Sequence, residues 1–133
     1  MIPFLFAVIY LAILVLSGFV FSQTARFAKE HPTIDSARTL EAFKGLARTN
    51  MKLALVLLPL YGVGILLTLV LVVRYGLLGL AACLGVNALI GVLGLYGMRL
   101  EKTVRSLPAA SEELRQEHRR VAESWVKKAL PDF

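Results

Sequence analysis

Three long runs of the chain contain no charged side chain, and they restrict the possible folds more than any other feature. The runs cover residues 2–21, 53–73 and 75–98, with only Arg74 between the second and the third. Twenty residues of α-helix extend about 30 Å, the thickness of a bilayer's hydrocarbon core. Only helices and closed barrels satisfy their backbone groups in lipid. We therefore expect an all-α integral membrane protein, a three-helix transmembrane bundle that makes residues 1–133 a single membrane domain.

The composition supports this class over two alternatives. The chain is 57% hydrophobic and 18% charged, whereas soluble domains lie near 45–50% and about 25%. In a soluble protein of 133 residues, too little chain would remain to cover three apolar helices. A cleaved signal peptide would need a basic segment before a shorter apolar core, but the residues before this first run carry no positive side chain.

The distribution of Lys and Arg predicts the orientation. Six lie in the loop of residues 22–52 and eight in the tail of residues 99–133, whereas the N-terminus has none and the turn between the second and third runs has only Arg74. Because basic loops stay on the cytoplasmic side, we expect the N-terminus outside a plasma or inner membrane, with loop and tail in the cytoplasm. The net charge of +6 then meets anionic lipid headgroups and not nucleic acid.

The cytoplasmic loop is expected to contain an amphipathic helix. His31-Pro32 should end the first helix, and Thr33 or Asp35 can cap the next one. Apolar residues then recur every three or four positions, at Ile34, Ala37, Leu40, Phe43 and Ala47. This helix could lie on the lipid headgroups or pack on the other cytoplasmic segment, and both arrangements are left open. Phe43 would anchor either contact.

The tail is expected to form a second amphipathic helix. Leu107-Pro108 should end the preceding helix, and Ser111 can cap the new one before two glutamates. One stripe of this helix contains Leu114, His118, Val121, Ala122, Trp125 and Ala129. Trp125, the only tryptophan, suits a membrane interface or a protein contact. We favour packing of this stripe on the cytoplasmic helix ends or on a partner subunit.

The third apolar run carries two stripes of small residues that favour close helix packing. Ala81, Gly85 and Ala88 form one stripe, and Cys83, Asn87 and Gly94 lie on roughly the opposite side. Asn87 is the one amide deep in a span, and an unpaired amide in lipid is costly. We expect it to bond across to Ser17, Tyr61 or Thr68. Alternatively, Asn87, Tyr61 and Gly94 line a pocket for a quinone, a lipid or a small solute.

Residues that carry chemistry are sparse. The three runs contain no Asp, Glu, Lys, Arg or His, which argues against a self-sufficient proton-coupled transporter. His31 and His118 lack ligand partners at helical spacing, and Cys83 is the only cysteine, so no metal site or disulfide is expected. The sequence contains no nucleophile motif or phosphate-binding loop, and we expect neither an enzyme nor a cofactor.

The predicted function is that of a small structural or accessory membrane subunit. It would pack through its third span with identical subunits or with a partner membrane protein. The alternative is an oligomeric transporter or channel, with a neutral pathway near Asn87.

Overall fold

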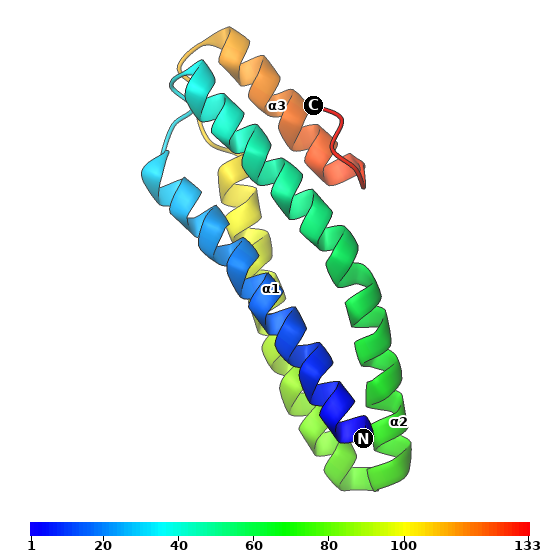
Figure 1. Cartoon of the computed structure of the whole chain (residues 1–133). Helices are drawn as coiled ribbons and strands as arrows, with labels where there is room; N and C mark the ends of the chain where they lie inside the picture. Colours follow the sequence, from blue (N-terminus) through cyan, green and yellow to red (C-terminus); the bar gives the residue numbers. More distant parts are fainter.

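The protein is all-helical, as predicted. The computed structural model describes residues 1–133 and contains α1 (Ile2–Glu30), α2 (Ala37–Arg105) and α3 (Glu112–Lys127). No β-strand is present, and Ile34 and Ala109 form one isolated bridge between the two loops. Figure 1 shows α1 and the two halves of α2 side by side, with α3 packed at the end opposite the N-terminus.

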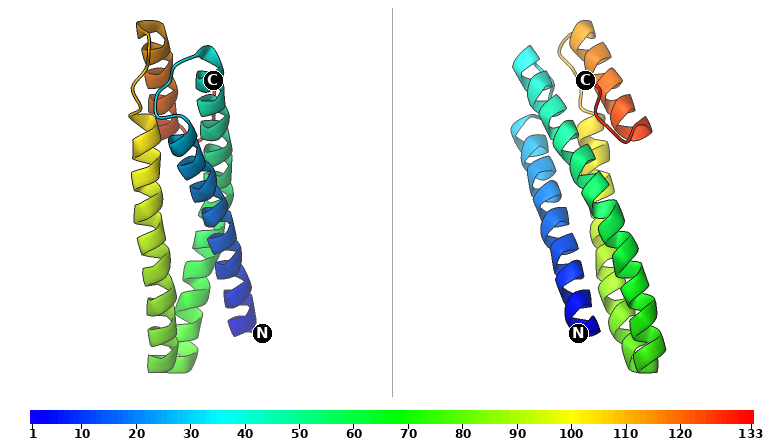
Figure 2. Two further views of the ribbon diagram at one scale, coloured as in Figure 1. Left: turned by 90° about the vertical axis from the view of Figure 1, so that its left-hand side faces the viewer. Right: turned by 45° about the vertical axis from the view of Figure 1, so that its right-hand side comes forward.

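Helix α2 folds back on itself at Gly76. This residue has φ 58° and ψ −133°, the only non-helical dihedrals inside the element. The reversal divides α2 into a first arm (residues 37–75) and a second arm (residues 77–105), which run antiparallel (Figure 2). Only glycine adopts this backbone conformation readily. The turn had been expected at Arg74 and lies two residues later.

Gly79 allows the two arms to approach closely just after the turn. A Cβ atom added there would lie 2.5 Å from the backbone carbonyl oxygen of Leu71 on the first arm. Real Cβ atoms do not approach a backbone oxygen this closely, so this corner of the hairpin needs a residue without a side chain.

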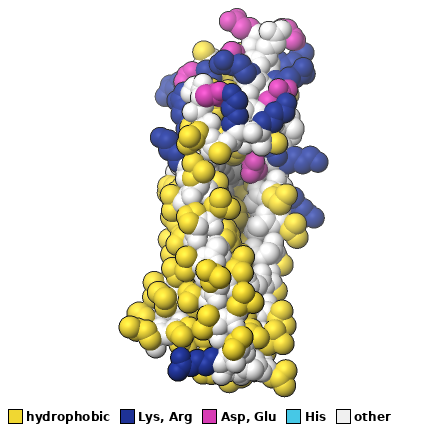
Figure 3. Space-filling view, turned by 90° about the vertical axis from the view of Figure 1, so that its right-hand side faces the viewer, with side chains coloured by type: hydrophobic (Ala, Val, Ile, Leu, Met, Phe, Trp, Pro, Cys, Tyr) yellow, Lys and Arg dark blue, Asp and Glu magenta, His cyan; other side chains and the backbone are white.

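Two helices, α1 and α2, are long and apolar enough to cross a membrane. Only 17% of the most apolar window of α1 and 11% of that of α2 are buried, whereas a core helix of a soluble protein is mostly buried. Figure 3 shows apolar side chains along the length of the bundle, which we call the shaft, and, apart from one basic group at the far end, the charged side chains gathered at one end. That end comprises α3, the loops of residues 31–36 and 106–111, and the adjoining helix ends, and we call it the head.

The helix boundaries in the head follow local hydrogen bonds. Helix α1 ends at Glu30, just before His31-Pro32. The cap of α2 is Ser36, and not Thr33 or Asp35, because its Oγ accepts from the Thr39 amide at 3.2 Å. Asp35 instead accepts from the Thr39 hydroxyl at 2.8 Å, and this bond lowers the pKa of the Asp35 carboxyl. Ser111 caps α3 as predicted.

A hydrophobic cluster holds the head together. It joins α1, both arms of α2 and α3 through ten buried residues: Phe27, Ile34, Leu40, Phe43, Leu46, Ala47, Met51, Val104, Val121 and Trp125. The amphipathic loop helix packs on the tail helix, which is one of the two arrangements that the sequence left open. The predicted loop helix and second span form one continuous first arm.

Candidate functional site

Polar residues follow one face of α1 through the centre of the bundle. Tyr10, Ser17 and Thr24 are seven residues apart, and all three are buried. The second arm has the same spacing at Asn87, Gly94 and Glu101. A seven-residue spacing keeps side chains on one helix face, so these two rows meet at successive levels between the helices.

The level farthest from the head is a closed hydrogen-bond cluster. The Tyr10 hydroxyl donates to Asn87 Oδ1 at 3.0 Å and lies 3.1 Å from Thr68 Oγ1. Asn87 Nδ2 donates to the carbonyl of Cys83 at 2.8 Å. The single Thr68 hydroxyl proton is donated either to the Tyr10 oxygen or to the carbonyl of Gly64 at 2.9 Å. Both ends of the Asn87 amide are therefore bonded within the chain.

The partner of Asn87 was not among the residues named from the sequence. Thr68 belongs to the same cluster, but it contacts Asn87 through the hydroxyl of Tyr10. Ser17 and Tyr61 lie nearer the head, where they line a different feature of the bundle.

That feature is a pocket of about 170 Å³ between α1 and the two arms, which we call the inter-helix pocket. Its polar lining comes from Ser17, Thr24, Asn50, Tyr61 and Glu101. Gly94 and Gly97 line it on the second arm, and Phe21 lines it on α1. The pocket thus brings together Tyr61 and Gly94 of the predicted ligand site, whereas Asn87 is not part of its lining.

Asn50 is the most unusual residue of this pocket. Its Nδ2 donates to Thr24 Oγ1 at 3.0 Å, and the Thr24 hydroxyl donates to the carbonyl of Val20 at 2.8 Å. Asn50 is only 7% exposed, yet its Oδ1 has no hydrogen-bond partner. A buried acceptor without a donor is costly, and such atoms are rare in native proteins.

Glu101 contributes the only charge of the inter-helix pocket. It lies three residues beyond the apolar run that ends at Met98, outside the predicted span. Burial raises the pKa of its carboxyl, and the nearby Arg105 partly opposes that shift. The Arg105 Nε lies 3.5 Å from the carboxylate, longer than a normal hydrogen bond, and it too has no hydrogen-bond partner.

The first small-residue stripe of the second arm faces away from the bundle. Ala81, Gly85 and Ala88 are all exposed, and nothing lies within 4 Å of a Cβ atom added at Gly85. On the opposite stripe, Cys83 is buried and Gly94 lines the inter-helix pocket, whereas Asn87 is exposed although its side chain bonds to Tyr10. The second arm therefore packs internally through part of one stripe and leaves the other accessible.

The two expected anchors of a partner contact are used inside the chain. Phe43 is fully buried and Trp125 is 8% exposed. The Phe43 ring lies 5.9 Å from the Trp125 ring and 4.5 Å from that of His118. These side chains hold α3 on the first arm.

His118 bonds α3 to the second arm. Its Nε2 lies 3.1 Å from the carbonyl oxygen of Val104, which can only accept, so this nitrogen donates. Burial lowers the pKa of the imidazole, although the bond to Val104 partly opposes the shift.

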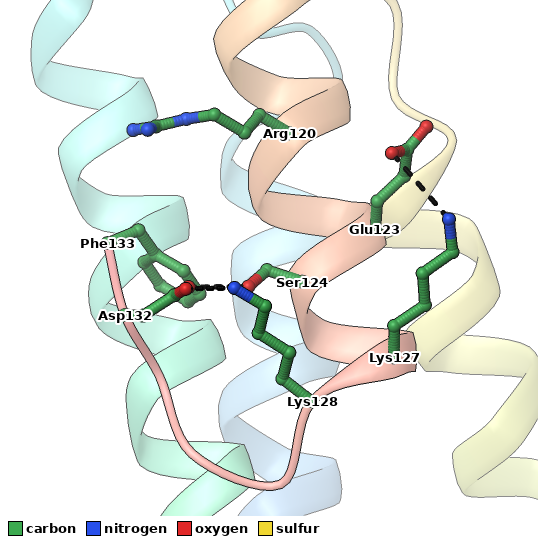
Figure 4. Close-up of a pocket in the computed structure, with 7 residues that line it drawn as sticks. All are labelled: Arg120, Glu123, Ser124, Lys127, Lys128, Asp132 and Phe133. Atoms are coloured by element: carbon green, nitrogen blue, oxygen red, sulfur yellow. Dashed lines mark hydrogen bonds and ion pairs between the residues drawn. The ribbon is translucent and has the colours of Figure 1, made fainter.

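A second pocket, of about 270 Å³, lies at the surface between α3 and the C-terminal segment (Figure 4). Its cations are paired within the chain: Lys127 with Glu123, Lys128 with Asp132, and Arg120 with Glu117. The hydrogen bonds from Lys128 and Ser124 lower the pKa of Asp132. The charged side chains of this pocket therefore all have partners of opposite sign within the chain.

Three residues of the bundle interior were missed from the sequence: Tyr10, Asn50 and Glu101. The seven-residue spacing of polar residues in α1 could have indicated Tyr10. Asn50 and Glu101 lie just outside the uncharged runs and could not be distinguished there from surface residues.

Comparison of the chain with protein-family models, curated proteins and solved structures gave no match.

Proposed function

We propose that this protein is a small, non-enzymatic integral membrane subunit that crosses the bilayer three times. The supporting observation is a long shaft with an apolar, exposed surface and a charged head at one end (Figure 3). Aliphatic side chains on α1 and on both arms of α2 are more than half exposed, including Leu11, Leu66 and Leu95. Lipid is the solvent in which such a surface is stable.

The charge distribution supports the proposed orientation. Every Lys and Arg except Arg74 lies at or near the head, and Arg74 lies two residues before the turn at Gly76. Under the positive-inside rule the head would be cytoplasmic, and the N-terminus and turn would face outward.

The proposed role is to associate with identical subunits or with another membrane protein through the exposed stripe of the second arm. Small side chains allow two helices to approach closely, where van der Waals packing and weak hydrogen bonds hold them together. The stripe is unoccupied within the chain, because Gly85 has open space beside it. This open space is the observation that carries the proposal.

The test compares two glycine substitutions. Gly85→Leu should abolish the oligomer or the co-purifying partner seen by native mass measurement in mild detergent. Gly62→Leu is the matched control, since Gly62 also lies in a helix and has open space beside it, but on the first arm. A wild-type protein that is always a lone monomer without a partner would refute the proposal.

A solute pathway is the second candidate, and the inter-helix pocket favours it. Tyr61 and Gly94, two of its expected residues, line that pocket. Asn87 supports it less, because its amide is bonded at both ends. Solute flux into proteoliposomes that is lost in Asn87→Leu, without loss of assembly, would favour this function.

A further inference from the structure

The inter-helix pocket contains a buried acceptor without a donor. The Asn50 Nδ2 already donates to the Thr24 hydroxyl, which in turn donates its own proton to the carbonyl of Val20. The Asn50 carbonyl oxygen is buried without a hydrogen-bond partner, and no other side chain that lines the pocket carries an N–H donor. An unpaired buried carbonyl is costly, so a ligand that donates a hydrogen bond to it would stabilise the site.

The charge of the lining restricts what that donor can be. No Lys, Arg or His lines the pocket, and Glu101 is its only ionisable acid. Arg105 forms an ion pair with this carboxylate at 3.5 Å but no hydrogen bond, so the carboxylate oxygens can still accept from a ligand. An anionic ligand would find no cation in the lining, whereas a cation with N–H donors would find acceptor oxygens.

The volume and the position of the pocket further restrict which ligand it can bind. A volume of about 170 Å³ holds roughly five water-sized groups, enough for a small amine but not for a quinone ring system with its tail. Glu101 lies three residues beyond the apolar run, which is about 4.5 Å along the helix. The acidic end of the pocket would therefore lie at headgroup level.

We propose that the inter-helix pocket binds a primary ammonium group, which donates to Asn50 Oδ1 and pairs with Glu101. Ser17 and Tyr61 supply hydroxyl oxygens as further acceptors. The ammonium group belongs to a free small amine or to the headgroup of an ethanolamine phospholipid. This binding does not depend on association through Gly85.

The experiment separates the two sources. Calorimetric titration of the detergent-solubilised full chain with ethanolamine measures binding of the free amine. Native mass spectrometry after incubation with equal amounts of phosphatidylethanolamine and phosphatidylglycerol measures lipid retention. We expect binding of ethanolamine, preferential retention of phosphatidylethanolamine, or both, and the pattern identifies the source.

Two variants and a control connect the binding to the pocket. Glu101→Gln removes the charge and Asn50→Leu removes the acceptor, and each should weaken binding about tenfold or more. Glu113→Gln is the matched control, because Glu113 is an exposed carboxylate of α3 outside every ion pair, and it should bind as the wild type does. Glu101→Gln keeps the side-chain shape, so it remains informative if Asn50→Leu does not fold.

Three results would overturn the proposal. One is absence of binding by both ethanolamine and phosphatidylethanolamine. Another is preferential retention of phosphatidylglycerol. The third is a Glu101→Gln protein that is folded by circular dichroism and binds as tightly as Glu113→Gln.

Discussion

At the scale of single residues, the Tyr10 hydroxyl has the most connections in the shaft. It bonds to Asn87 on the second arm and Thr68 on the first, while its ring packs 4.3 Å from that of Phe6 and lies against Gly64. One oxygen thus joins α1 to both arms. Where apolar side chains and lipid are equally hydrophobic, such bonds and close packing hold helices in register.

Tyr10→Phe should lower the free energy of unfolding by about 1 kcal/mol, because it removes the donor to Asn87 and leaves the ring in place. Denaturation in mixed micelles, followed by circular dichroism, measures this change. Tyr96→Phe is the control, since the Tyr96 ring packs on Phe21 but the residue is exposed. Equal stability of the two variants would show that the Tyr10 bond contributes nothing.

Gly76 has a different requirement, because its backbone conformation reverses the chain. Gly76→Ala should destabilise the protein by about 1–3 kcal/mol, the cost of a strained backbone. Gly62→Ala should be neutral or stabilising, because alanine is the better helix former and Gly62 has open space. The same micelle assay compares them, and an unaffected Gly76→Ala protein would mean that the turn lies elsewhere.

At the scale of the elements, α3 is held by a buried neutral histidine. Its pKa in the docked state is lowered from 6.5. At pH values between the lowered pKa of the docked state and the ordinary pKa of the undocked state, the undocked state binds a proton that the docked state does not. Docking of α3 therefore strengthens as pH rises through this window. The contribution of neutral His118 to the docking of α3 is complete above about pH 6.5 and is progressively lost as pH falls below that value.

We therefore expect acidification to loosen α3. Trp125 is the only tryptophan and is buried against Phe43, so its emission should shift to longer wavelength between pH 7.5 and about pH 5. His118→Gln should lose this pH dependence, whereas His31→Gln should keep it. A transition that persists in His118→Gln would assign the effect to another group.

Many of the helix boundaries could be predicted from the sequence. The helix ends at His31-Pro32 and near Leu107-Pro108, and the cap at Ser111, depend on residues close in the chain. The bond between Tyr10 and Asn87 joins residues 77 positions apart and depends on the rotation of two helices about their axes. For the same reason the inter-helix pocket could not be predicted: Thr24, Asn50 and Glu101 meet only once three helices are in register.

At the scale of the whole molecule, the structure is a helical hairpin with α1 alongside it and a charged head at one end. In the proposed topology this hairpin crosses the membrane, with the head and the turn at Gly76 on opposite sides. Single cysteines in a Cys83→Ala background test this directly, because a membrane-impermeant maleimide labels only one side of an intact cell.

Arg74→Cys places the label beside the turn, and Glu113→Cys places it on the exposed surface of α3. In intact cells that express the protein, we predict that Arg74→Cys is labelled and that Glu113→Cys is labelled only after permeabilisation. Labelling of both positions without permeabilisation, or of neither, would put the turn and the head on one side and contradict the proposed three-crossing topology.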